Sequence, residues 1–422
     1  MDKDKLIKMI SWLYLAVVLF SAYLISYLPD YNRWFIIFLV FNFLLALAIS
    51  SRTNNYVLII SRILIGLLFI YSGFVKGLDP LGFQYRIEDY FYAYNLAWAL
   101  PSALFLSILL NAIEFSLGVL LLFNLRVKWV SIITLLVMFL FTATTLNDAL
   151  NNPVPDCGCF GDALIISNWQ TLYKNLVIDA LVILIFLHRH SFENRRSLKF
   201  QNSSIILAFT VFVIFEIYSI MHQPIIDFRP WKEGTKLIPD NLKESQYYFT
   251  YKNTNSGELK EYLNTDLPWE DSIFMKNWTY VSTREQDPNV EQFKTFPLID
   301  SNNVDISKEV VSSTSPSFLM VVTKMADANE KALKKFDAIY EACKNRGWNF
   351  YILSADVPED LALYRKKYSL ANYPVLNADD TSLKAAIRAN PGLIVVKSAV
   401  VLKKYNYRDI PEPSVLINLF NK

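Results

Sequence analysis

The chain has 422 residues, 53% of them hydrophobic and 19% charged, and its mean hydropathy is +0.25. A composition this apolar excludes an ordinary soluble protein, and a net charge of +2 provides no basic field for binding nucleic acid. Three cysteines are too few for a disulfide-based scaffold or a four-thiolate zinc site, so no metal centre is expected.

Seven apolar stretches before residue 222 are long enough to cross a bilayer, since a spanning helix needs about 20 mostly apolar residues. They centre on residues 9–28, 34–50, 56–75, 102–123, 129–146, 172–188 and 204–221. Lys3, Lys5 and Lys8 make the first stretch similar to the start of a signal peptide, but no small-x-small cleavage site follows it. We therefore expect seven retained spans.

The Lys and Arg residues that flank the spans predict the orientation, because they are enriched on the cytoplasmic side of membrane proteins. With a cytoplasmic N-terminus, the inner flanks hold ten of them and the outer flanks before the last span hold four. The inner set is Lys3, Lys5, Lys8, Arg52, Arg126, Lys128, Arg189, Arg195, Arg196 and Lys199, and the outer set is Arg33, Lys76, Arg86 and Lys174. The sequence thus predicts an inner-membrane protein in contact with lipid, with residues 147–171 and 223–422 in the periplasm.

Charged residues inside spans are costly and usually face partners or cavities. Arg62 lies early in the third predicted span, Glu114 in the middle of the fourth, and Asp179 in the sixth. Arg62 either extends to the cytoplasmic interface or faces a cavity. Glu114 shares a helix face with Asn111 and Gly118, which indicates packing against other helices, and its role is either structural hydrogen bonding or proton relay.

The end of the third predicted span is marked by Asp79-Pro80, because proline interrupts a helix. Lys76 lies one turn earlier, and its ammonium is expected to meet an acidic side chain at the outer edge of the membrane. The candidates are Asp79, Glu88 and Asp89. The alternative is an exposed pair that contributes little.

The loop between the fifth and sixth predicted spans carries Cys157-Gly158-Cys159, and a Ser167-x2-Gln170 capping box begins the next span. Two thiols one residue apart in an oxidising compartment invite a disulfide, and its small ring strains the preferred geometry. Strained, exposed disulfides tend to be labile or catalytic. Cys157 and Cys159 are therefore a candidate redox pair between a periplasmic thiol and a lipid quinone, with Glu114 as candidate proton acceptor. The alternative is that both cysteines only pack or staple the loop.

This part of the chain, about residues 56–190, resembles the DoxX/MauE superfamily of redox-associated membrane proteins. The similarity lies in Arg62-x3-Gly66 with Ser72-Gly73-x2-Lys76, in Glu114-x3-Gly118, and in Cys157-Gly158-Cys159-Phe160-Gly161. The resemblance implies a four-helix core with a role in quinone-linked or disulfide-linked chemistry, or in maturing a disulfide-bearing periplasmic enzyme. A quinone in such a core is expected near Arg62 and Glu114.

Residues 223–422 have the dispersed charge of a soluble region. The aromatic and basic segment 227–235, which includes Trp231, is expected at the membrane interface. Asn255-Ser256-Gly257 is expected to form a turn between two short strands at 247–251 and 258–262. Further on, strands are predicted at 317–323, 348–354, 392–397 and 400–405, and helices at 329–345, 358–367 and 413–420.

This order of strands and helices resembles the thioredoxin-like fold, and Asn390-Pro391-Gly392 falls where that family carries its cis-proline. A thioredoxin-like oxidoreductase needs a Cys-x-x-Cys after its first strand, but residues 324–330 contain no cysteine. Cys343 falls on the apolar face of its helix, where a cysteine is more often part of the core than a catalyst. The domain is therefore expected to be redox-inactive and to bind or position a partner.

The predicted architecture is a polytopic α-helical membrane bundle followed by a periplasmic α/β domain. Its segments are two transmembrane helices (1–55), a four-helix DoxX/MauE-like bundle (56–190), a cytoplasmic loop with the seventh transmembrane helix (191–222), a β-rich linker region (223–310) and a thioredoxin-like domain (311–422). The predicted function is that of a redox-associated accessory protein, which couples Cys157 and Cys159 to quinone or to disulfide maturation of a partner. The alternative is a non-enzymatic scaffold of an envelope complex, and the sequence leaves open whether the protein is an enzyme.

Overall fold

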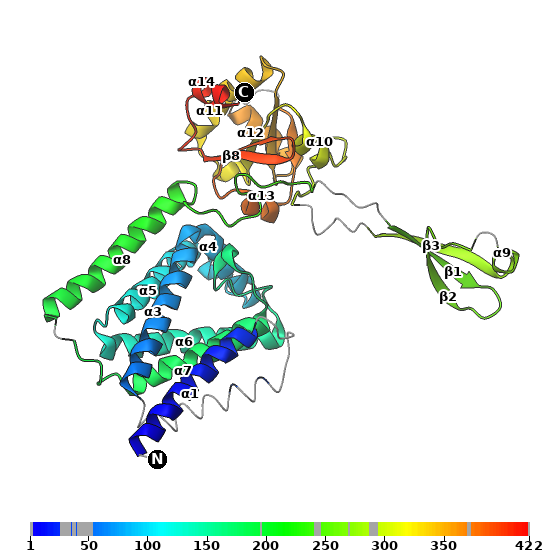
Figure 1. Cartoon of the computed structure of the whole chain (residues 1–422). Helices are drawn as coiled ribbons and strands as arrows, with labels where there is room; N and C mark the ends of the chain where they lie inside the picture. The colour runs from blue at the N-terminus through cyan, green and yellow to red at the C-terminus, as the bar shows by residue number, and fades with distance from the viewer. Residues whose placement is uncertain are drawn as a thin grey trace. The chain divides into compact units, whose positions relative to one another are not determined.

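The structure, a computed structural model, describes residues 3–25, 35, 39, 54–194, 196–239, 246–268, 271–286, 294–368 and 373–420. The chain divides into two units, Met1–Arg229 and Pro230–Lys422. The first unit is built from helices, and the second contains two β-sheets (Figure 1).

The helical unit consists mainly of long helices. They are α1 (Lys3–Leu24), α3 (Asn55–Leu78), α4 (Pro80–Ala93), α5 (Ala103–Leu122), α6 (Val127–Asn151), α7 (Asn168–Leu187) and α8 (Leu198–Met221), with 3₁₀ helices η3 (Ala97–Ser102) and η4 (Gly161–Ala163). Asp79 ends α3 as predicted, and its carboxylate accepts a hydrogen bond from the Gly82 N–H at 3.1 Å, which caps the start of α4.

Five helices in the described part of the chain are long and apolar enough to cross a membrane: α3, η3 with α5, α6, α7 and α8. They coincide with the third to seventh predicted spans. The first predicted span overlaps α1, whose apolar run Met9–Ser21 is shorter than a spanning segment. The second predicted span, 34–50, lies outside the described residues except for Phe35 and Leu39. A total of seven spans therefore stays a prediction.

Helices α3 and α5 pack closely because glycines stand at their contact. A Cβ on Gly118 would lie 2.6 Å from the Ile70 backbone nitrogen, and one on Gly66 would lie 2.8 Å from that of Leu122. Small residues permit such a close approach of two helix backbones. The apolar core of this unit joins side chains of α1, α3, α5, α6 and α7, and α8 packs against α5.

Helix α7 begins where the sequence predicts it. The Ser167 hydroxyl accepts a hydrogen bond from the backbone N–H of Gln170 at 3.3 Å. In return, the side-chain oxygen of Gln170 accepts one from the backbone N–H of Ser167 at 3.1 Å. This reciprocal capping box satisfies two backbone donors at the helix start. It also holds the C-terminal end of the loop that contains the two neighbouring cysteines.

The smaller sheet of the second unit has strand order β2-β1-β3 and is antiparallel. Its elements are β1 (Gln246–Asn253), β2 (Leu259–Leu263), α9 (Ser272–Asn277) and β3 (Trp278–Gln286). The side chain of Asn253 accepts from the N–H groups of Asn255 and Ser256 at 2.9 and 3.0 Å. These bonds form the predicted turn between β1 and β2.

The larger sheet has strand order β6-β5-β4-β7-β8. Strands β4, β5 and β6 are parallel, whereas β7 is antiparallel to both β4 and β8. The elements are α10 (Ser307–Ser312), β4 (Ser317–Val322), η6 (Met325–Asp327), α11 (Glu330–Lys344), β5 (Asn349–Ser354), α12 (Pro358–Lys367), β6 (Val375–Asn377), α13 (Asp380–Ala386), β7 (Gly392–Lys397), β8 (Val400–Asn406) and α14 (Pro413–Leu419). The predicted strand–helix alternation and the terminal hairpin are confirmed, and the Asn390–Pro391 peptide bond is cis as expected.

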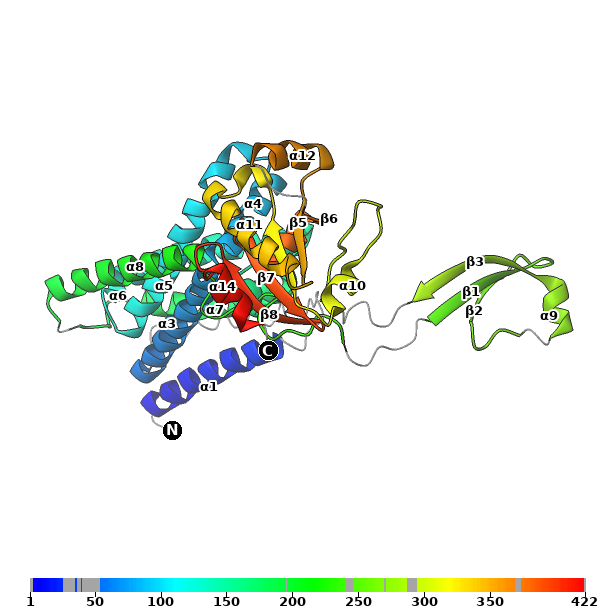
Figure 2. The same cartoon turned by 90° about the horizontal axis from the view of Figure 1, so that it is seen from above.

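Helices cover both faces of this sheet (Figure 2). One face packs against α11, α12 and α14, and Phe318, Phe336 and Leu416 belong to that core. The other face packs against α10 and α13, with Leu319 and Leu383 in its core. All residues of β4 are buried, because helices cover it on both sides. Such a continuous apolar run is typical of a central strand.

Trp231 lies in the core of the second unit, so the expected position at a membrane interface is wrong. Its side chain is 2% exposed and packs against Phe296, with ring centroids 4.9 Å apart and the rings tilted by 32°. Its indole N–H donates to the Lys294 carbonyl at 2.7 Å. The protein interior therefore supplies both the apolar surface and the hydrogen-bond acceptor that a tryptophan would otherwise meet at the membrane interface.

Candidate functional site

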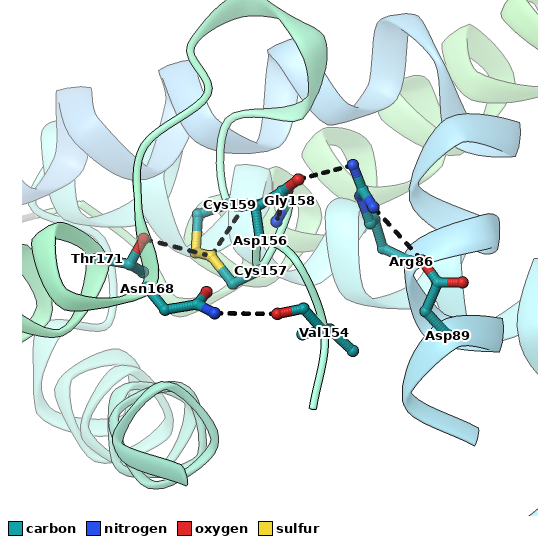
Figure 3. A network of polar contacts seen from close by, with 9 residues as sticks. All are labelled: Arg86, Asp89, Val154, Asp156, Cys157, Gly158, Cys159, Asn168 and Thr171. Atoms are coloured by element: carbon teal, nitrogen blue, oxygen red, sulfur yellow. Dashed lines mark hydrogen bonds and ion pairs between the residues drawn. A yellow bond between two sulfur atoms is a disulfide. The ribbon is translucent and has the colours of Figure 1, made fainter. Parts of the chain in front are cut away.

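The Cys157-Gly158-Cys159 loop follows α6 and is held at both ends (Figure 3). The Asn168 side-chain NH₂ donates to the Val154 carbonyl and to the Asn152 side chain, both at 2.9 Å. Gly158 has a φ of +65°, and a Cβ there would lie 2.9 Å from the Arg86 side chain. Glycine therefore suits this position both in backbone conformation and in space.

Arg86 on α4 fastens the loop from the side. Its guanidinium donates to Asp156 at 2.7 Å and to Asp89 at 3.4 Å (Figure 3). The other Asp156 oxygen accepts from the Gly158 N–H at 2.9 Å. The ion pair and the short turn together restrict the backbone on which the two cysteines stand.

The structure pairs Cys157 with Cys159 in a disulfide. Cys157 is 8% exposed and Cys159 is half-buried, so the disulfide is less accessible than an exposed, labile one. The Cys159 N–H donates to the Cys157 sulfur at 3.3 Å, and the Thr171 hydroxyl lies 3.8 Å from the same sulfur. Ser72 on α3 donates to the Cys159 carbonyl at 2.8 Å. Cys157 is buried because this part of the loop folds back onto α3 and α7.

Both cysteines line a cavity of about 430 Å³ inside the helical unit. Side chains of α3, α4, α5, α6 and α7 form its mainly apolar wall. Its volume falls within the range of about 300–1,000 Å³ that is typical of small-molecule sites. Leu140 and Tyr94 belong to the lining and are 53% and 43% exposed, so the cavity reaches the surface of the bundle. Leu140 lies within α6, which is one of the span candidates.

The cavity wall also carries an ion pair between Lys76 of α3 and Glu114 of α5. Their side chains are 3% and 6% exposed. The expected partners of Lys76 at the membrane edge are therefore wrong, because the lysine turns inward to an acid 38 positions away in the sequence. The Lys76 ammonium also lies 4.8 Å from the centre of the Phe83 ring, which favours a cation in a dry site.

Lys174 of α7 is a second cation on the cavity wall. Its ammonium lies 4.4 Å from the centre of the Phe160 ring, next to Cys159, and it interacts electrostatically with Glu114 and Lys76. From the sequence alone, Lys174 is predicted only as a charge that flanks a span. The available signal was the Ser167–Gln170 capping box, which starts the helix at Asn168 and so places Lys174, one turn after Gln170, within the helix.

A polar group at another part of the wall is Tyr90 of α4, whose hydroxyl donates to Asp148 at 2.6 Å. Burial, and then the bond to Asp148, raises the pKa of Tyr90 well above its ordinary value. Tyr90 is therefore a protonated donor at all physiological pH values. On the opposite wall, Asn175 donates to Thr145 at 3.1 Å.

Glu216 of α8 is a buried acid that the sequence analysis missed. It is fully buried, accepts from the Asn111 side chain at 3.0 Å and interacts electrostatically with Lys76. One acid within an 18-residue apolar window of the last span was the available signal. Lys76 thus lies between two carboxyl groups, Glu114 and Glu216, that come from different helices.

Arg62 and Asp179 are not among the residues that line the cavity. The Arg62 guanidinium donates to the carbonyls of Leu121 and Leu122 at the end of α5, and it lies 5.9 Å from the Phe192 ring. It is 7% exposed, so it caps a helix end inside the protein. Thr142 donates to Asp179 at 2.7 Å. Among the predicted site residues, the structure brings together Cys157, Cys159 and Glu114.

The structural class is that of a multi-pass membrane protein with a helical bundle and a C-terminal α/β region. Residues 54–188 match the family model described as "Methylamine utilisation protein MauE". This match covers α3 to α7 and the Cys-Gly-Cys loop, so the core is MauE-like, while α1, α8 and the second unit lie outside it. No curated protein matches the chain. Within the described residues no three His, Cys, Asp or Glu side chains gather in a way that could hold a metal ion.

Proposed function

We propose that the chain is a redox-associated membrane protein that passes electrons from thiols outside the membrane to a lipid quinone through Cys157 and Cys159. The observation that carries this proposal is the shared cavity. One apolar cavity of about 430 Å³ is lined by Cys157 and Cys159, by the buried carboxylate of Glu114, and by the cations Lys76 and Lys174. It reaches the surface of the bundle at Leu140, where we expect it to face lipid.

The chemistry of the cavity suits a quinone. A quinone head group is a flat apolar ring with two carbonyl oxygens, so it needs apolar walls and hydrogen-bond donors. Phe69, Phe141 and Ile178 supply such walls, and the ammonium groups of Lys76 and Lys174 are donors at the same cavity. Arg62 has no part in this proposal, because it does not line the cavity and its guanidinium donates to carbonyls at the end of α5.

In the first half of the proposed reaction, a partner thiolate attacks the Cys159 sulfur and the Cys157 sulfur leaves. Cys159 is the more exposed of the two cysteines. The Cys159 N–H donates to the Cys157 sulfur, where it stabilises negative charge on the leaving thiolate. A second partner thiol then releases Cys159. The partner gains a disulfide, and Cys157 and Cys159 hold the two electrons and two protons.

In the second half the Cys157–Cys159 disulfide forms again, and two electrons and two protons leave the pair. A bound quinone accepts two electrons and two protons when it becomes a quinol. Glu114 is the carboxylate on this wall and can hold a proton in transit, while Lys76 compensates its negative charge when the carboxylate is ionised. Each turnover thus converts two thiols and one quinone into one disulfide and one quinol.

The second unit suits partner binding better than catalysis. Its sheet order and the bonds of Asn390 to Lys324 (2.9 Å) and to the Asn329 N–H (3.3 Å) support a thioredoxin-like fold whose proline loop meets the turn after β4. That turn has no cysteine, and Cys343 is fully buried. We infer that this unit, in the periplasm, binds the protein whose thiols are oxidised.

The family description names methylamine utilisation, and maturation of a disulfide-bearing enzyme of that kind is one form the partner can take. The match ends at residue 188, so the second unit is the part of this chain that we expect to select its own partner.

The decisive experiment measures dithiothreitol-dependent reduction of a short-chain ubiquinone by the full-length protein in lipid nanodiscs. The double variant Cys157→Ser/Cys159→Ser is expected to lose the activity, and Cys343→Ser is expected to keep it. Unchanged quinone reduction in the double variant would falsify the proposal. A loss in Cys343→Ser, with normal folding, would move the chemistry to the second unit.

A scaffold role remains the second candidate because the second unit offers no reactive thiol. It predicts a stable stoichiometric partner after purification in mild detergent, and recovery of that partner with the Cys157→Ser/Cys159→Ser variant as well. The oxidoreductase proposal predicts instead that a partner is trapped only when Cys157 alone is replaced, as a mixed disulfide with Cys159.

A further inference from the structure

A groove of about 690 Å³ lies on the outside of the helical unit, between α5, α6 and α8. Its walls are aliphatic and aromatic side chains such as Leu117, Ile133, Ile206 and Phe209. Only 17% of the apolar window of α8 is buried, because this helix leans on α5 and leaves its other faces open. The groove does not belong to the cavity at the disulfide, since the two share no lining residue.

One end of the groove is polar and basic. Arg126, Trp129 and Asn202 line it there, and Arg126 donates to the Asn202 side chain at 2.8 and 3.2 Å. A guanidinium has five N–H donors, so donors remain for an anion. The described part of the loop between α7 and α8 carries Arg189, Glu193 and Arg196, and the first turns of α6 and α8 carry Lys128 and Lys199.

The length of the groove fits one leaflet of a bilayer. Along α8 it extends from Asn202 to Thr210, which at 1.5 Å per residue is about 12 Å. Half of a hydrocarbon core is about 15 Å. Trp129, 58% exposed, stands at the basic end, where aromatic side chains mark the membrane–water interface. The basic end of the groove therefore matches the anionic head group of a phospholipid, and the apolar part, about one leaflet long, matches its acyl chain.

We propose that this groove binds an anionic phospholipid, with an acyl chain between α5, α6 and α8 and the phosphate group at Arg126. The lipid would fill the space that α8 leaves open and join α8 to the MauE-like core. This site is independent of the thiol chemistry proposed above, and its test needs no redox readout.

The test is native mass spectrometry of the full-length protein in mild detergent, titrated with dioleoyl phosphatidylglycerol or dioleoyl phosphatidylcholine. The wild type is expected to retain phosphatidylglycerol preferentially. Arg126→Gln is expected to bind it roughly tenfold more weakly, a change of about 1.4 kcal/mol. Ile206→Trp fills the groove without removing charge and is expected to reduce retention of both lipids.

Two matched controls separate the groove from general attraction to a basic surface. Arg189→Gln removes a charge outside the groove lining, and Ile217→Trp adds the same bulk to an exposed position further along α8. Both are expected to retain phosphatidylglycerol like the wild type. The proposal is overturned if both lipids bind equally, if Arg189→Gln is as weak as Arg126→Gln, or if Ile206→Trp leaves retention unchanged. Dissociation of a dimer by Ile206→Trp would overturn it too, in favour of a second copy of this chain as the occupant.

Discussion

Lys76 and Glu114 come from different helices and meet with side chains that are 3% and 6% exposed. Two such charges are expensive to take out of water, and each compensates the other. Removal of either partner leaves a buried charge alone, which costs about 3–5 kcal/mol in comparable sites. Lys76→Met and Glu114→Gln are therefore each expected to lower the thermal unfolding temperature sharply.

The double variant Lys76→Met/Glu114→Gln tests whether the pair itself is responsible. The double variant is expected to lose less stability than the two single variants lose together, because no uncompensated charge remains in it. Thermal unfolding of all four proteins in the same detergent measures this coupling. Additive losses would show that the two residues act separately, with Glu216 as the effective partner of Lys76.

Cys343 is fully buried, and burial raises the pKa of its thiol to about 12. Because the unfolded thiol has a pKa of about 8.5, the unfolded state loses its proton first as the pH rises. The stability contributed by the neutral thiol is complete below about pH 8.5 and is lost towards pH 12, by up to about 1.4 kcal/mol per pH unit. Between pH 8 and pH 10 the free energy of unfolding of the wild type is expected to fall relative to that of Cys343→Ala. A pH-independent difference, measured by urea unfolding, would contradict the burial of this thiol.

At the scale of elements, the contact of α3 with α5 positions the cavity wall, because Lys76 and Glu114 stand on these two helices. Gly118→Leu would place side-chain atoms against the backbone of Ile70 and Gly66, which cannot move aside. Overpacking of this kind costs about 1–3 kcal/mol and more where backbone must shift. We expect low yield of folded protein by size-exclusion chromatography. Ala143→Leu, on an exposed face of α6, is the matched control and should behave like the wild type.

The Cys-Gly-Cys loop is restrained by α4 through the Arg86–Asp156 ion pair, whose side chains are 29% and 16% exposed. A small cavity of about 30 Å³ lies on the Gly158 side of the loop, whereas the cysteines line the apolar cavity. A water-soluble reductant therefore needs the loop to loosen. Arg86→Ala is expected to accelerate disulfide reduction by a membrane-impermeant phosphine up to about fivefold, because a partly exposed pair contributes about 1 kcal/mol or less. Glu88→Gln is the control, and a rate no faster in Arg86→Ala than in Glu88→Gln would contradict the restraint.

Elements with local signals could be predicted from the sequence, but the contacts between elements could not. The Ser167–Gln170 capping box, the turn at Asn255 and the buried Cys343 each depend on residues a few positions apart, and all three are confirmed. Lys76 meets Glu114 only because α3 is rotated to face α5, and this rotation depends on the packing of Gly66 against Gly118. Hydropathy places Lys76 at a span end but does not fix the side of the helix on which it lies.

For the whole molecule, the two ends of the helical unit are distinct. At one end the loop after α5 contacts both the loop after α7 and the start of α8, since Asn124 donates to the Glu193 carbonyl at 2.9 Å and the Arg126 N–H donates to Gln201 at 3.1 Å. At the other end, the segment after α8 that includes Arg229 lines the same small cavity as Gly158 and Arg86. The chain therefore leaves the helical unit at the end where the Cys-Gly-Cys loop lies. The excess of Lys and Arg at the first end predicts that this end is cytoplasmic.

This topology is tested with two matched serine-to-cysteine variants in a Cys343→Ala background. Ser191→Cys stands exposed in the loop before α8, and Ser256→Cys stands exposed in the turn between β1 and β2. In intact spheroplasts a membrane-impermeant maleimide is expected to label Ser256→Cys, because residues beyond α8 are predicted to lie outside. Ser191→Cys should react only after detergent opens the membrane. The reverse pattern would invert the orientation and place Cys157 and Cys159 in a reducing compartment, where a disulfide between them is not maintained. Labelling of both variants in intact spheroplasts would instead show that α8 does not cross the membrane, so that the chain's second unit and the α7–α8 loop share one side.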